Sequence, residues 1–252
     1  MQRQSLPILD QAARVLPPTR DLPTVRELDA LWQEVASRPL WAPPNFWRYL
    51  RLRWRTRLRF INPDDVAVQA PAGKVNDCAS CTDMCCIGPR ATVLLRFRDI
   101  ATLKDIGRTE LMTQSKPQFT AETLANHPNL ARQVASMAWQ RFPVLRQNSF
   151  GACAALTDTG LCGLYPYWPM TCARFPYALD FEPFRLAYSQ RCQSFWIHPG
   201  AKSKARAMQV AAVATYNERI KDLILLEYAP ERLADLGLLQ YLSHPARPGA
   251  ST

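Results

Sequence analysis

Histidine, lysine and long apolar runs are all scarce in this sequence. Each of the three histidines precedes a proline, and none is spaced from a cysteine in the manner of a zinc ligand (His127, His198 and His244). This pattern argues against sites that combine cysteine with histidine. No apolar run approaches the roughly 20 residues of a membrane-spanning helix, so we expect no transmembrane segment.

The opening of the chain also lacks the basic segment and apolar run of a secretory signal. We therefore expect a cytoplasmic protein. With 252 residues the chain can bury a full hydrophobic core, and it does not need disulfides in order to fold. Because cytoplasmic thiols stay reduced, clustered cysteines in such a protein are more typical of metal sites than of disulfides.

The net charge of +10 comes mostly from arginine, since only six of the 31 basic residues are lysine. Iron–sulfur clusters held by four thiolates are anionic and would offset part of this charge. The basic surface that remains predicts an acidic protein partner, an anionic lipid surface or nucleic acid. Composition alone does not choose between these partners.

Cysteine, in contrast, is unusually dense. Eight cysteines fall in two groups, the first of them spaced as Cys-x-x-Cys-x-x-x-Cys-Cys: Cys78, Cys81, Cys85 and Cys86, then Cys153, Cys162, Cys172 and Cys192. Adjacent Cys85 and Cys86 cannot both bury their sulfurs in one apolar direction, so core packing does not explain them. Either they face two different sites, or one binds metal while the other packs or serves redox chemistry.

Eight sulfurs would suffice for two metal sites of four thiolates each, with ligands from both groups. Zinc and iron–sulfur clusters both accept four thiolates, so the spacing predicts a metal without choosing one. The all-cysteine inventory favours an iron–sulfur cluster of the 4Fe-4S type, with zinc as the alternative. Aromatic residues such as Phe150 and Trp168 would shield a cluster from water, although core packing explains them more simply.

Apolar periodicity predicts helices on both sides of the cysteines. The first opens with a Thr24–Glu27 capping box, buries a stripe that includes Leu28 and Val35, and ends at 37–39. Further helices are expected over 99–106, 129–142 and 203–242, the last capped by Ser203 and interrupted before a helix that follows Pro230. A short strand is expected over 91–97, with hairpins that turn at Asp158–Gly160 and around Glu182–Pro183. The first of these hairpins would place Cys153 and Cys162 at its two ends, close enough to converge.

Residues 50–60 alternate apolar side chains with arginines and fit either a strand or a helix. The arginines are Arg51, Arg53, Arg55, Arg57 and Arg59. They could bind an acidic protein partner or an anionic surface, and with Trp54 among them also single-stranded nucleic acid. A solvated face is the simpler explanation.

Together these elements predict a mainly α fold with small β-hairpins (α+β), in which helices flank an irregular cysteine-rich metal-binding core. Residues 1–70 would form an N-terminal arm, a helix and the arginine and aromatic segment. Residues 71–200 would form the cysteine-cluster domain, and residues 201–245 the C-terminal helices. We expect these three segments to pack as one globular unit.

The combined motifs resemble one known family. The first cysteine group is followed by Cys153 and then by Cys162-Gly-Leu-Tyr165-x-x-x-Pro169-x-x-Cys172-x-Arg174-Phe175-Pro176. Over about residues 75–195 the chain is similar to the bacterial CxxCxxxCC domain family, described as zinc- or iron-chelating. The resemblance implies that the seven cysteines of these motifs, with Cys192, are the metal ligands.

Two positions depart from the family pattern. Trp168 stands where the family usually has the arginine of an Arg-Pro pair, and Ala173 stands where an arginine usually follows the cysteine. Here Arg174 comes one place later. Larger members of the family include flagellin lysine N-methylases, so the resemblance implies methyl transfer as a conceivable activity.

Three hypotheses follow from the sequence. The first is an iron–sulfur protein with a redox, electron-transfer or metal-handling role, the second a protein lysine N-methylase-like enzyme, and the third a zinc-stabilised interaction module. The absence of a glycine-rich loop after a strand, and of a Cys-x-x-x-Cys-x-x-Cys radical motif, argues against a self-contained methylase. Few titratable groups lie near the cysteines: Asp77, Asp83, Asp158, Tyr165 and Arg174.

Overall fold

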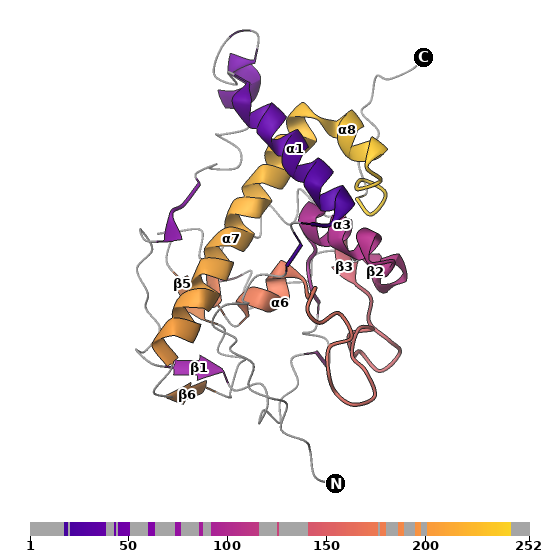
Figure 1. Ribbon diagram of the computed structural model, residues 1–252, viewed down its shortest axis with the longest axis vertical. Coiled ribbons are helices and arrows are strands. Elements are labelled where there is room, and N and C mark those ends of the chain that lie inside the picture. The colour runs from indigo at the N-terminus through magenta and orange to yellow at the C-terminus, as the bar shows by residue number, and fades with distance from the viewer. Residues whose placement is uncertain are drawn as a thin grey trace.

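The computed structural model combines helices with short strands, as Figure 1 shows. It describes residues 18–19, 21–38, 43, 45–50, 60–63, 74–76, 86–87, 92–115, 125, 141–175, 177–179, 186–188, 195–197 and 201–242. The α-helices are α1 (Pro23–Ser37), α3 (Phe97–Asp105), α6 (Met170–Arg174), α7 (Ala201–Tyr228) and α8 (Pro230–Asp235), with a 3-10 turn at Thr109–Leu111. The strands are β1 (Lys74–Asn76), β2 (Met112–Ser115), β3 (Phe142–Leu145), β4 (Tyr177–Leu179), β5 (Leu186–Tyr188) and β6 (Phe195–Ile197).

The strands form three antiparallel pairs, β1 with β6, β2 with β3, and β4 with β5. This confirms a mixed α+β fold. The pair β4–β5, in which Tyr177 lies opposite Tyr188, confirms the hairpin predicted around Glu182–Pro183. The pair β1–β6 joins segments more than a hundred residues apart, with Asn76 opposite Phe195.

Helix α1 confirms the first predicted helix, but its predicted capping box is wrong. The helix begins at Pro23, the N-cap is Leu22, and no side chain of the helix caps it. The main-chain N–H groups of Thr24 and Val25 instead donate to the Asp105 carboxylate, at 2.9 and 3.3 Å. An acceptor from the end of α3 thus replaces the local cap that the sequence predicts.

Helix α3 begins at Phe97, two residues before the predicted start, and ends at Asp105, one residue before the predicted end. The predicted stop, Gly107, follows in the turn with a φ of 69°. The strand predicted over 91–97 is reduced to one antiparallel bridge between Leu94 and Val144. The helix predicted over 129–142 falls mostly outside the described residues. Its last residue, Phe142, begins β3 instead.

The predicted C-terminal helices are present as α7 and α8, but α7 begins at Ala201, so the predicted cap at Ser203 is wrong. The predicted stripe on α7 is buried at Ala212, Tyr216 and Ile220. None of the helices in the described ranges is long and apolar enough to cross a membrane. Of the ambiguous segment 50–60, residues 51–59 lie outside the described residues, while the five residues 46–50 are helical.

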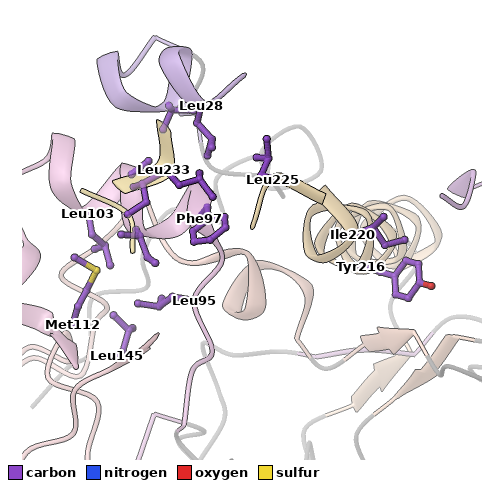
Figure 2. Close-up of a cluster of buried hydrophobic side chains, with 14 of the residues drawn as sticks. Leu28, Leu95, Phe97, Leu103, Met112, Leu145, Tyr216, Ile220, Leu225 and Leu233 are labelled. Carbon is purple, nitrogen blue, oxygen red and sulfur yellow. The ribbon is translucent and has the colours of Figure 1, made fainter. Parts of the chain in front are cut away.

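Helix α7 runs along the molecule, with β1 near its beginning and α8 near its end (Figure 1). It contacts α6, β4, β1, α8 and α1. The buried apolar cluster in Figure 2 gathers Leu28 of α1, Phe97 of α3 and Leu233 of α8, and continues to Ile220 of α7. The core therefore draws on residues from all three predicted segments.

Asp105→Ala tests the cap of α1. The substitution leaves the N–H groups of Thr24 and Val25 without their carboxylate acceptor, so we expect the free energy of unfolding to fall by about 1–2 kcal/mol. Chemical denaturation measures the loss. Asp235→Ala, at an exposed carboxylate of α8, serves as the control and should change stability little. Equal stabilities of the two variants would contradict the cap.

Candidate metal centre

The structure describes four of the eight predicted cysteine ligands, Cys86, Cys153, Cys162 and Cys172, and none of these four is in a disulfide. The other four, Cys78, Cys81, Cys85 and Cys192, lie outside the described residues. Within the described part of the chain, no three Cys, His, Asp or Glu side chains are grouped as a metal site would group them. The arrangement of the four described cysteines nevertheless shows which segments lie together.

Cys86 and Cys153 are neighbours on adjoining segments. The main-chain N–H of Cys153 donates to the carbonyl of Cys86 at 2.7 Å, and the next residues, Ile87 and Ala152, form an antiparallel bridge. Cys153 is buried, and Cys86 is half-buried. The last cysteine of the first group therefore meets the first cysteine of the second group.

Cys162 closes a tight turn. Thr157 and Leu161 are joined by a main-chain hydrogen bond of 2.8 Å, Gly160 has a φ of 78°, and Cys162 pairs with Leu156. This confirms the turn predicted at Asp158–Gly160. The expectation that Cys153 and Cys162 form the two ends of that hairpin is wrong, because the turn is shorter than predicted.

Cys172 lies exposed on α6, a short helix that follows Pro169. Three hydrogen bonds position this helix. The N–H of Met170 donates to Asp99 at 2.9 Å, the hydroxyl of Thr171 to the carbonyl of Leu94 at 2.8 Å, and the hydroxyl of Thr215 to the carbonyl of Met170 at 3.3 Å. The helix that carries the predicted ligand Cys172 is therefore hydrogen-bonded to both α3 and α7.

A buried charged cluster adjoins α6, and the sequence analysis did not predict it. Asp99 accepts hydrogen bonds from the N–H groups of Arg96 and Met170, at 2.8 and 2.9 Å. Asp222 of α7 accepts one from the N–H of Phe97, so its carboxyl group turns inward although the residue as a whole is only half-buried. Burial raises the pKa of Asp99 to about 6 and that of Asp222 to about 8.

Arg174 belongs to the same cluster. Burial, and to a lesser extent the charge of Arg96, lower the pKa of its guanidinium to about 10, while the charge of a thiolate at Cys172 acts in the opposite direction. One of its terminal nitrogens donates to the carbonyl of Tyr177 at 2.6 Å. Part of this cluster could have been found from the sequence, because Asp99 is an acidic residue in the first turn of the helix that follows Arg96.

The remaining titratable candidates are less informative. Asp77 and Asp83 lie outside the described residues. Asp158 occupies the exposed turn before Cys162, which is the structural role expected of an aspartate in such a turn. Tyr165 is 47% exposed, and its ring lies 4.9 Å from that of Trp168.

No protein-family model, curated protein or solved structure matches this chain. The resemblance to the CxxCxxxCC family therefore rests on the motif residues themselves.

The two raised carboxyl pKa values predict a pH dependence of stability. The folded protein holds protons on Asp99 and Asp222 that the unfolded chain releases above about pH 4. This contribution to stability is complete below about pH 4 and is lost as the pH rises through 6 and 8. Asp222→Asn should therefore gain in stability relative to the wild type as the pH rises over this window.

Denaturation at several pH values measures that difference, with Asp235→Asn as an exposed control whose difference from the wild type should stay constant. A difference for Asp222→Asn that does not change with pH would contradict the buried position of its carboxyl group.

Proposed function

We propose that this protein binds metal through its cysteines and holds one or two iron–sulfur clusters, in a redox, electron-transfer or metal-handling role. The observation that carries the proposal is the position of the first cysteine group. Described residues on both sides of this group in the sequence pair with segments of the second group, because Asn76 lies opposite Phe195 and Ile87 forms a bridge with Ala152.

The first contact is the strand pair β1–β6. Asn76 lies opposite Phe195, while Cys78 follows Asn76 by two residues and Cys192 precedes Phe195 by three. This pair therefore joins the segment that leads into the first group to the segment that follows the second group. The second contact is the hydrogen bond between Cys153 and Cys86, with the bridge beside it.

The ligands of a four-thiolate site must converge from distant parts of the chain. The two contacts bring such distant segments together. The low exposure of Cys153, 7%, also suits a ligand that needs shelter from water. The all-cysteine ligand set and its family resemblance support iron–sulfur over zinc. In this proposal both groups of cysteines supply ligands to the same centre.

Metal and acid-labile sulfide analysis of protein purified without oxygen tests the proposal. We expect iron with matching sulfide in the wild type. Cys86→Ser and Cys153→Ser should each lose metal and melt at a lower temperature, because site formation and folding are coupled. If both cysteines bind the same centre, the double variant should lose no more metal than either single variant.

Ala154→Ser adds a hydroxyl one position beyond Cys153 and is the matched control, with metal content expected as in the wild type. Zinc without sulfide would replace the iron–sulfur centre by a structural zinc site. Full metal content in both cysteine variants would contradict the ligand assignment.

A second candidate function is binding to an anionic lipid surface. Trp47 is 74% exposed and Phe46 and Leu50 are 40% exposed, immediately before the alternating arginines of 51–59. Arg48 is held against α7, where it pairs with Glu227 at 2.7 Å. Exposed aromatic and aliphatic side chains beside arginines suit the interface of a membrane that contains acidic lipids.

Trp47→Ala should weaken sedimentation with vesicles of phosphatidylcholine and phosphatidylglycerol several-fold, because the indole would no longer enter the interface. Phe150→Ala removes another exposed aromatic ring, one that is 87% exposed beside the cysteines, and should bind like the wild type. This candidate would be contradicted if the wild-type protein stayed in the supernatant, or if both variants lost vesicle binding equally. Retention on single-stranded nucleic acid instead would identify a different anionic partner.

A further inference from the structure

Several buried N–H groups around α6 have no acceptor within the described part of the chain. They are the Nε of Arg96, the Nε of Arg174 and the indole Nε1 of Trp168. Buried donors are nearly always hydrogen-bonded, and leaving one without an acceptor costs about 1–3 kcal/mol. Donors without acceptors on neighbouring elements therefore indicate that a ligand supplies the acceptors.

The charges of the cluster point to the same kind of ligand. The guanidinium of Arg96 lies close enough to those of Arg174 and Arg219 to lower the pKa of both, although in each case burial lowers it more. Three carboxyl groups adjoin these cations, namely Asp99, Asp222 and Glu218, and the charge of Glu218 raises the pKa of the other two. An anion between Arg96 and Arg174 would relieve the repulsion between their guanidinium groups.

Each neighbouring carboxylate accepts a hydrogen bond from a group other than the Nε of Arg96. The two oxygens of Asp99 each accept a main-chain N–H, and Asp222 accepts the N–H of Phe97. Glu218 accepts from Lys221 at 2.6 Å and lies 3.8 Å from the Nε of Arg98. The charge of Arg96 lowers the pKa of both Asp99 and Asp222, so these carboxyl groups lie near it, yet its Nε has no acceptor within the described residues.

We propose that Arg96 and Arg174 bind an anion beside Cys172. Such an anion would accept from both Nε groups through charge-assisted hydrogen bonds. Two sources share this chemistry, a small oxyanion from solution and the metal–thiolate group that includes Cys172. Only the second source rests on the proposed metal function.

Phosphate titration into the full-length protein, as purified, distinguishes the two sources. At constant ionic strength, calorimetry and thermal unfolding measure phosphate binding by the wild type, Arg96→Met, Arg174→Met and Arg48→Met. Arg48, ion-paired to Glu227 away from α6, is the matched control. If the anion comes from solution, phosphate should stabilise the wild type and Arg48→Met, and each cluster variant should lose about tenfold or more in affinity.

If the anion is the metal–thiolate group, phosphate should leave the wild type unchanged. Arg96→Met and Arg174→Met should then shift the visible spectrum or lower the metal content, while Arg48→Met should not. Arg174 also donates to Tyr177, so Arg174→Lys, which keeps the charge, replaces Arg174→Met if that variant fails to fold. Absence of both responses, or cluster variants that behave like Arg48→Met, would overturn the proposal. Failure of the metal function alone would leave the phosphate titration intact as a test.

Discussion

The carboxylate of Asp99 organises the centre of this protein, because it accepts the first N–H groups of two helices at once. Through its hydrogen bonds to Arg96 and Met170, α3 and α6 begin at the same point. Asp222 adds an acceptor from α7 to the same junction. Burying two carboxyl groups costs free energy of desolvation. Hydrogen bonds from N–H groups at helix starts, which have no acceptor within their own helix, offset that cost here. The position of Cys172 depends on this junction.

The cysteine groups depend on a different kind of contact. Short antiparallel pairs, rather than a continuous sheet, bring the segments of the two groups together at Asn76–Phe195 and at Cys86–Cys153. Each pair contains few hydrogen bonds, and isolated two-stranded pairs are marginally stable in water. A metal held between the groups would therefore contribute a large share of the stability of this region, in the same way as metal sites do in small metal-dependent domains.

Much of the helical fold could be predicted from the sequence, because it depends on local periodicity. The buried stripes of α1 and α7, the stop at Gly107 and the turn before Cys162 all follow from residues close together in the chain. The starts of α1 and α6 could not be predicted, since Asp105 and Asp99 act on residues of other elements. The pairing of Cys153 with Cys86 was missed for the same reason, because the sequence favoured the nearer Cys162.

The length of α7 has a consequence for how the two ends of the molecule can influence each other. Its 28 residues, at a rise of 1.5 Å each, span about 42 Å. The β1–β6 pair lies at its beginning, whereas Arg48 pairs with Glu227 near its end (Figure 1). At physiological ionic strength the Debye length is about 8 Å, so a change of surface charge near β1 is largely screened at the exposed aromatic residues beside Arg48. An effect that joins the two ends would have to pass through packed elements, and α7 contacts both β1 and α8.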